Sequence, residues 1–142
     1  MMQNLYIETI DYTCASDYDR DQRNAWKRGT ENQERWTAAI QTQYFIVAEV
    51  DGNLAGFGSL ENGSYIDFMY TSKNYLRQGV AQIIYGQLEA RAIELGSMSL
   101  TSDVSKTARP FFEKQGFRVV SENTNWVHDV WITNFKMRKE LH

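Results

Sequence analysis

Two Asx-Gly dipeptides divide the middle of the chain into three runs of strand-forming residues, and this pattern limits the fold more than any other feature. The runs are residues 44–50, 54–60 and 65–71. The dipeptides between them are Asp51-Gly52 and Asn62-Gly63. Such pairs favour the two-residue turns that join antiparallel strands, because both turn positions need a positive φ. The sequence therefore predicts an antiparallel meander of three strands.

The hydrophobic period changes after the meander. Apolar residues then recur at steps of three and four, at Val80, Ile83, Ile84, Leu88, Ala92 and Leu95. This spacing predicts an amphipathic helix over residues 79–95, which Gly96 is placed to end. Further along, we expect a helix at 106–115 with Pro110 in its first turn. Strands are expected at residues 97–102, 117–120 and 126–137.

The first third of the chain is more polar. Residues 5–10 are rich in strand formers and predict a first strand, and we expect two short helices at 16–28 and 31–41. The resulting order of elements predicts an α+β fold with a mixed, mostly antiparallel central sheet flanked by helices. The chain has 142 residues, which suits a single domain spanning 1–142.

Composition excludes several classes of protein. The lone cysteine, Cys14, cannot form an internal disulfide, which favours a reducing, cytoplasmic location. One cysteine with His128 and His142 makes a zinc site unfavourable, so no metal is expected. No apolar run reaches the length that spans a membrane. The net charge of −3 disfavours binding to nucleic acid. Formation of a homodimer is left open.

A loop between the third strand and the long helix has the features of an anion site. It carries Lys73, Arg77 and Gln78, and Gly79 opens the helix. The first N–H groups of a helix lack intrahelical partners and lie at the positive end of its dipole, where a phosphate can bind. The alternative is an ordinary strand-to-helix turn in which glycine serves only the backbone conformation.

Two segments, taken in order, resemble the GCN5-related N-acetyltransferase (GNAT) family. The family's cofactor motif, Gln/Arg-x-x-Gly-x-Gly/Ala, aligns with Leu76-Arg-Gln-Gly-Val-Ala81. The later motif, Asn-x-x-Ala-x-x-Phe-Tyr-x-x-x-Gly-Phe, aligns with residues 105–117. The resemblance covers about residues 44–139. It is nearest to a bacterial subgroup that contains Ala-Arg-Pro-Phe-Phe-Glu-Lys, here 108–114, and a closing Thr-Asn-Phe-x-Met, here 133–137.

The resemblance implies the acyl-CoA N-acyltransferase fold and acetyl-CoA as co-substrate. In the family, the acetyl-pantetheine arm pairs with an exposed strand edge, and the pyrophosphate binds at a helix start. The implied cofactor-binding residues are Met69, Tyr70, Thr71, Arg77, Gln78, Gly79, Val80, Ala81, Gln82, Ser105 and Phe112.

Three residues depart from the family pattern. Leu76 replaces a polar residue, and Ser105 replaces the common asparagine. Phe112 occupies the position where many members place the tyrosine that protonates the leaving thiolate. The general acid of the reaction is therefore unassigned from the sequence.

Candidate catalytic groups are the carboxylates of Asp67 and Glu61, because an amine must lose a proton before it attacks a thioester. In a regular strand, the side chains of Tyr65, Asp67, Met69 and Thr71 share one face. The alternative is a structural hydrogen bond for Asp67 and a solvated turn for Glu61.

The acceptor is expected between residues 16–41 and the final strands. This region contains the four tryptophans, which serve either as pocket walls or as core: Trp26, Trp36, Trp126 and Trp131. It also contains His128, which lies either in the pocket or on the surface. Aromatic residues beside carboxylates would suit a cationic or an aromatic amine.

The sequence thus predicts an N-acetyltransferase that moves an acetyl group from acetyl-CoA directly to a primary amine of a small molecule or peptide. A non-catalytic acyl-CoA-binding or sensing module is the alternative, because Phe112 lacks the usual hydroxyl. An interaction domain without a CoA site is a third reading.

Overall fold

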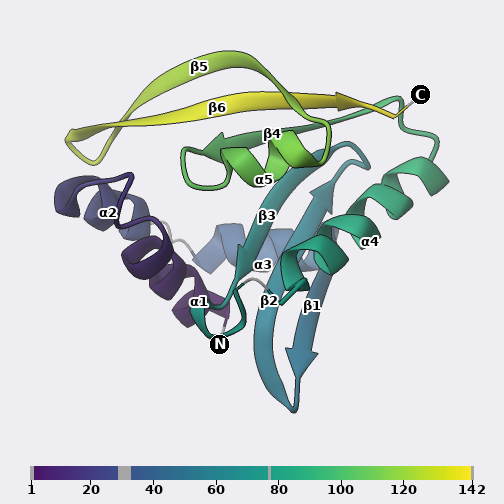
Figure 1. The fold of residues 1–142 in the computed structure, drawn as a ribbon, viewed down its shortest axis with the longest axis horizontal. Helices are drawn as coiled ribbons and strands as arrows, with labels where there is room; N and C mark the ends of the chain where they lie inside the picture. The colour runs from purple at the N-terminus through teal and green to yellow at the C-terminus, as the bar shows by residue number, and fades with distance from the viewer. Residues whose placement is uncertain (1, 29–32, 77, 142) are drawn as a thin grey trace.

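A single six-stranded sheet, in the order β1-β2-β3-β4-β6-β5, forms the centre of the molecule (Figure 1). The computed structural model describes residues 2–28, 33–76 and 78–141. The strands are β1 (Tyr44–Val50), β2 (Asn53–Glu61), β3 (Tyr65–Thr71), β4 (Ser99–Ser105), β5 (Arg118–Val127) and β6 (Val130–Glu140). Neighbouring strands run antiparallel except β3 and β4, which run parallel. The predicted α+β fold with a mostly antiparallel sheet is confirmed.

Helices cover both faces of this sheet. They are α1 (Met2–Glu8), η1 (Thr9–Thr13), α2 (Arg20–Lys27), α3 (Gln33–Thr42), η3 (Lys73–Tyr75), α4 (Val80–Glu94) and α5 (Arg109–Lys114). In Figure 1, α4 and α5 lie on the nearer side of the sheet and α3 lies behind it. The described residues form three hydrophobic clusters: one joins the sheet to α4 and α5, another joins it to α1 and α3, and a smaller one joins α2 to β6. No helix in the described ranges is long and apolar enough to cross a membrane.

The predicted meander is present as β1, β2 and β3. Asp51-Gly52 and Asn62-Gly63 both have positive φ angles, 52° and 81° in the first turn and 51° and 74° in the second. A third turn of the same kind joins β5 to β6 at residues 128–129, with φ angles of 43° and 69°. The expected single strand over 126–137 is therefore wrong, because this turn divides it.

The N-terminal segment is a helix and not the predicted strand. Leu5, Tyr6, Thr9 and Ile10 are buried, and their spacing places them on one side of α1 and η1. These side chains pack against the α3 side of the sheet, and this tertiary contact overrides the strand propensity of the local sequence.

The two polar helices are present, and α2 is shorter than expected. α2 begins at Arg20 because Asp19 caps it: the Asp19 carboxylate accepts from the Gln22 N–H, and the Gln22 side chain accepts from the Asp19 N–H. The other helix is described from Gln33, because residues 29–32 lie outside the described ranges.

The long helix α4 matches its prediction closely, with Gly96 (φ 80°) just beyond its end. Ile83 and Leu95, expected in the core, are exposed, and Tyr85 is buried in their place. The helix approaches β2 closely because a glycine lies beneath it. A Cβ atom on Gly58 would lie 2.6 Å from Cγ2 of Ile84.

A β-bulge in β3 breaks the alternation of its side chains. Gly58 lies opposite Met69 and Leu60 lies opposite Ile66, so β3 has one residue more than β2 across this step. The hydroxyl of buried Ser59 accepts a hydrogen bond from the Phe68 N–H at 3.2 Å. The predicted common face is wrong, since Asp67 contacts α3 whereas Met69 packs on the α4 side.

The segment after β4 also differs from its prediction. β4 continues to Ser105, and α5 begins at Arg109 and not near 106, with Pro110 in its first turn as expected. The Ser105 hydroxyl accepts from the Ala108 N–H at 3.1 Å, which holds residues 106–108 in a turn before the helix.

Candidate active site

The parallel strands β3 and β4 separate from one another soon after they meet. Their pairing is limited to Tyr65 with Thr101 and Ile66 with Ser102. At this point the Ser102 hydroxyl donates to the Ile66 carbonyl oxygen at 2.8 Å. Beyond it, the strand edges diverge, which leaves the backbone groups on this side of β3 able to pair with a ligand that enters between the strands.

A cavity of about 290 Å³ occupies this divergence. Six of the eleven predicted cofactor-binding residues line it, and they come from β3, α4, β4 and α5: Met69, Tyr70, Thr71, Ala81, Ser105 and Phe112. Most of the remaining wall is apolar, including Val104, Ala108 and Phe111. Its shape and lining fit a narrow, largely uncharged chain such as a pantetheine arm.

The start of α4 provides N–H groups for an anion. Gly79 precedes the helix with φ 82°, no side chain caps it, and a Cβ atom there would meet nothing within 4 Å. The first helical hydrogen bond runs from the Ile83 N–H to the Gly79 carbonyl oxygen at 3.0 Å. Among the described residues, the three N–H groups before it have no helical partner, and groups of this kind can bind a diphosphate.

The other residues predicted around this helix start contribute in different ways. The Val80 side chain is buried, which leaves its backbone N–H as the group for a ligand. The side chain of Gln82 exchanges two hydrogen bonds with Gln115, of 3.1 and 2.8 Å, and so joins α4 to the end of α5. Gln78 donates to the Asn74 carbonyl oxygen. Arg77 lies outside the described residues.

A second cavity of about 640 Å³ lies between residues 18–26 and the β5–β6 hairpin. Its polar walls include three asparagines on one side of the hairpin, Asn123, Asn125 and Asn134. Four residues line both cavities: Trp26, Tyr70, Asp103 and Ser105. The two cavities therefore meet beside the point where β3 and β4 separate, which allows two ligands to approach one another there.

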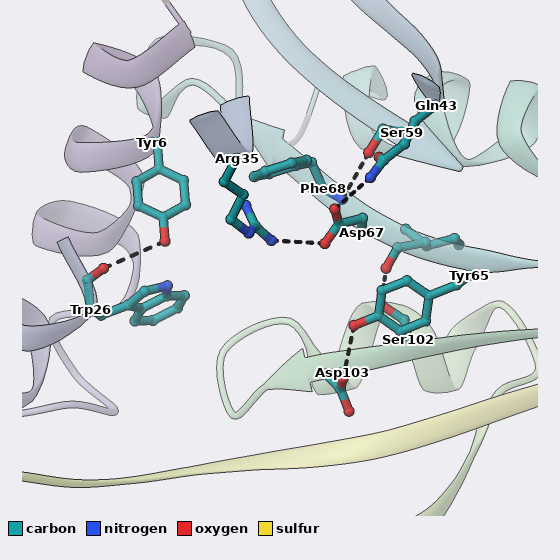
Figure 2. A network of polar contacts seen from close by, with 11 residues as sticks. Tyr6, Trp26, Arg35, Gln43, Ser59, Tyr65, Asp67, Phe68, Ser102 and Asp103 are labelled. Carbon is teal, nitrogen blue, oxygen red and sulfur yellow. Dashed lines mark hydrogen bonds and ion pairs between the residues drawn. The ribbon is translucent and has the colours of Figure 1, made fainter. Parts of the chain in front are cut away.

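Two carboxylates lie near the separation of β3 and β4, Asp67 on β3 and Asp103 on β4 (Figure 2). The Asp67 carboxylate binds the Arg35 guanidinium at 2.9 Å and the Gln43 amide at 2.8 Å, so each of its oxygens has a partner. The Asp103 carboxylate accepts a hydrogen bond from the Tyr65 hydroxyl at 2.7 Å. Burial, together with the Asp103 and Asp67 charges, raises the pKa of Tyr65, which keeps the hydroxyl protonated as a donor.

Two other tyrosines border the cavities with protonated hydroxyls. Burial raises the pKa of Tyr70 well above its usual value. Burial also raises the pKa of Tyr18 to about 12. The Tyr18 hydroxyl donates to the Thr133 carbonyl oxygen at 2.7 Å and accepts from the Lys106 N–H at 2.9 Å, so it fixes the hairpin relative to the end of β4.

Comparison with known proteins gives the family. The model of the acetyltransferase (GNAT) domain matches residues 14–141. The chain belongs to the GNAT family. It is similar to an uncharacterised N-acetyltransferase, YafP, of Escherichia coli K12, with 33% identity over 135 residues, which cover 94% of this chain and 84% of the relative.

Solved structures agree with this membership. A GCN5-related N-acetyltransferase from Rhodopseudomonas palustris superposes with a TM-score of 0.93 at 28% identity, over 99% of this chain and 88% of that one. The PaiA N-acetyltransferase of Thermoplasma acidophilum, crystallised with coenzyme A, has a TM-score of 0.77 at 18% identity, over 97% and 89% of the two chains. At that identity the second likeness shows the GNAT fold alone.

Three further residues considered from the sequence of this GNAT chain, Glu61, Phe112 and His128, lie in different surroundings. Glu61 ends β2 and is not among the described residues that line either cavity. Phe112 is buried and packs edge-to-face on Phe117. Its side chain has no hydroxyl that could protonate a leaving thiolate. His128 lies in the turn of the hairpin and lines the larger cavity.

The four tryptophans divide among three environments. Trp36 is buried in the core beneath α3, and Trp26 lines both cavities. Trp126 and Trp131 are neither core nor pocket wall: they are 59% and 57% exposed and pack against each other. The predicted aromatic acceptor pocket therefore retains one of its four candidate tryptophans.

Sequence analysis missed Asp103 and the three asparagines. Asp103 alternates with buried Ser102 and Val104 along β4, which places it on the opposite face of the sheet. Asn123 and Asn125 are two residues apart on β5, and Asn134 lies opposite Asn123 on β6. Alternation could have indicated a polar strand face here, but only the fold shows that this face borders the separation of β3 and β4.

Proposed function

We propose that this GNAT acetyltransferase moves the acetyl group of acetyl-CoA directly to a primary amine. The observation that carries the proposal is the pair of adjoining cavities at the separation of β3 and β4, which share four lining residues. One cavity adjoins the uncapped start of α4, and the other opens toward α2 and the hairpin. Such an arrangement holds two substrates with their reacting atoms together, which converts a bimolecular step into a local one.

The residues predicted to hold acetyl-CoA have distinct tasks in this proposal. The edge of β3 at Met69, Tyr70 and Thr71 binds the pantetheine arm, while the N–H groups at the start of α4 bind the diphosphate. Ala81 keeps the wall beside the helix start narrow, and Phe112 closes the cleft from α5. Backbone donors near the strand separation stabilise negative charge that develops on the thioester oxygen.

The proposed reaction balances as follows. The substrate ammonium gives up one proton to become a neutral amine, whose nitrogen then bonds to the thioester carbon. The carbon–sulfur bond breaks, and its electron pair leaves on the thiolate of CoA. The nitrogen loses a second proton, so that one proton ends on the thiol and one is released. Asp67 stays the predicted acceptor of the first proton, and the donor to the thiolate is water or a neighbouring hydroxyl.

Direct transfer is supported by the state of the lone cysteine. Cys14 is buried, and burial raises the pKa of its thiol. A thiol held protonated in this way is a poor nucleophile, which disfavours an acetyl-cysteine intermediate.

The buried Phe112 favours one competing function, a non-catalytic module that binds acyl-CoA. Two measurements separate the alternatives. First, CoA should raise the Tm of the protein by mass action if the cleft binds it. Second, a panel of amines should release free thiol from acetyl-CoA and yield acetylated products by mass spectrometry. A rise in Tm without turnover of any amine would favour the binding module, and no change in Tm would contradict both functions.

A further inference from the structure

The larger cavity has one fixed charge among the described residues that line it, the carboxylate of Asp103. Asp103 also lines the smaller cavity, so this residue lies beside both cavities. The Tyr65 hydroxyl donates to one of its oxygens, which orients the carboxylate without neutralising it. Lys136 is its cross-strand neighbour on β6, and no ion pair joins the two in the described part of the chain.

The nearby carboxylate of Asp67 is in a different situation. Its charge is balanced by Arg35, and Gln43 binds its second oxygen. Of the two carboxylates at the separation of the strands, Asp103 is therefore the one whose negative charge faces the larger cavity without an ion-pair partner. A protonated amine, with a pKa of about 8 for an α-amino group and about 10 for a simple alkylamine in water, carries the complementary charge.

The rest of this cavity presents neutral hydrogen-bonding groups. Asn123, Asn125 and Asn134 form one polar surface, within which the Asn125 amide donates to Asn134 at 3.3 Å. Each amide offers both donors and an acceptor, and these three form too few bonds with one another to use them all. Such a surface matches a ligand body with alternating donors and acceptors, such as amides or hydroxyls. No lysine or arginine lines this cavity, and His128 in the hairpin turn is the one basic side chain among the described residues of its wall, so a carboxylate or phosphate on the ligand would find no permanently charged cationic partner there.

We infer that the acceptor is an alkylamine on a neutral, hydrogen-bonding body, whose ammonium binds Asp103 and whose amides or hydroxyls bind the three asparagines. This inference rests on the proposed acetyltransferase function and deepens it by naming the class of acceptor. A volume of about 640 Å³ accommodates a molecule the size of a dipeptide amide or an aminosugar. Both share the inferred chemistry, and the test separates them.

The first experiment compares matched amines that differ by one anionic group. The pairs are an amino-acid amide with its free amino acid, and an aminosugar with its phosphate ester. We expect the neutral-bodied member to have a kcat/KM at least about tenfold higher in at least one pair, and the pair that reacts identifies the body. Equal or faster turnover of the anionic members would overturn the inference while leaving the acetyltransferase function intact.

The second experiment asks whether Asp103 acts through its charge. Asp103→Asn should lower kcat/KM for the preferred alkylamine at least about tenfold, chiefly through KM, and Asp103→Glu should recover part of it. A hydrazide acceptor on the same body is uncharged at neutral pH, and its kcat/KM should change by less than about twofold in Asp103→Asn. A purely structural role for Asp103 would lower turnover of both acceptors equally, which would overturn the inference.

Two controls make the result specific. Glu122→Gln removes an exposed carboxylate from β5 that lines neither cavity in the described chain, and it should leave both acceptors unaffected. If no amine of the panel is acetylated although CoA raises the Tm, the proposed transfer function fails and the acceptor site fails with it. If amines are acetylated but Asp103→Asn does not lower kcat/KM selectively for the alkylamine, only the inferred acceptor site is rejected.

Discussion

At the scale of single residues, the two glycines that flank α4 share a backbone state but differ in what they border. Gly79 and Gly96 have φ angles of 82° and 80°, and a Cβ atom on either would meet nothing within 4 Å. Any side chain at either position thus incurs a similar conformational cost, about 1 kcal/mol or slightly more. Only Gly79 adjoins the N–H groups that we assign to the diphosphate.

Gly79→Glu should therefore abolish binding of CoA while the protein still folds. The new carboxylate repels the diphosphate and competes for the same N–H groups, which should weaken CoA at least about tenfold. Calorimetric titration with CoA measures the loss. Gly96→Glu is the matched control, with a similar decrease in Tm and unchanged affinity. Equal affinities in the two variants would remove the diphosphate from the start of α4.

Asp67→Asn tests the predicted proton acceptor. The asparagine keeps the size of the side chain but loses the ion pair with Arg35. If Asp67 accepts the amine proton, kcat should fall at least about a hundredfold and the acidic limb of the pH–rate profile should change. The measurement is kcat against pH for both proteins. A loss of stability with an unaltered profile would show that Asp67 only ties β3 to α3.

At the scale of elements, the sequence predicts those strands and helices whose formation depends on residues close together in the chain. The Asx-Gly turns and the period of α4 carry their own signals, so the meander and the long helix were foreseen. The helix at Leu5–Ile10 and the bulge at Asp67 were not, because each depends on partners distant in sequence: the core beneath α3 and the buried hydroxyl of Ser59. For the same reason, the motifs predicted several residues that line the smaller cavity, whereas Asp103 and the asparagines of the larger cavity were not predicted.

Ser59→Ala should show how much the bulge depends on that hydroxyl. Without it, the Phe68 N–H is left buried without its acceptor, which costs about 1–3 kcal/mol. Because the bulge sets the edge of β3, we also expect a higher KM for acetyl-CoA. Urea denaturation measures the first effect and steady-state kinetics the second.

Ser99→Ala provides the comparison for this variant. Ser99 starts β4 and has no side-chain hydrogen bond within the described part of the chain, so its loss should change stability by less than about 0.5 kcal/mol. If the two variants are equally stable, the hydroxyl of Ser59 does not hold the bulge.

At the scale of the whole molecule, the two halves of the sheet share only a short pairing between β3 and β4, so other contacts must hold them at a fixed separation. α4 packs over the first half, and Tyr85 extends from it to the rings of Phe111 and Phe117 on the second. Beside it, Glu89 accepts a hydrogen bond from Tyr85 and binds Lys139 of β6 at 2.9 Å. This cluster fixes the width of the cleft.

Glu89→Gln should therefore weaken the molecule in a way that depends on pH. Burial alone would raise the pKa of Glu89, but the bonds from Tyr85 and Lys139 outweigh it and lower the pKa below the usual 4.5. A carboxyl group with a depressed folded pKa stabilises the fold above its unfolded pKa, and this stability is lost as the pH falls through the folded pKa. We expect the variant to be less stable by about 1 kcal/mol at pH 7, and the difference to fade as the pH falls below 4.5 and through the depressed pKa of Glu89. Glu94→Gln, which breaks only the exposed pair with Arg91 on the same helix, should have little effect at either pH. Urea denaturation across this range measures both variants, and a difference that persists undiminished at low pH would mean that the charge of Glu89 does not join the two halves.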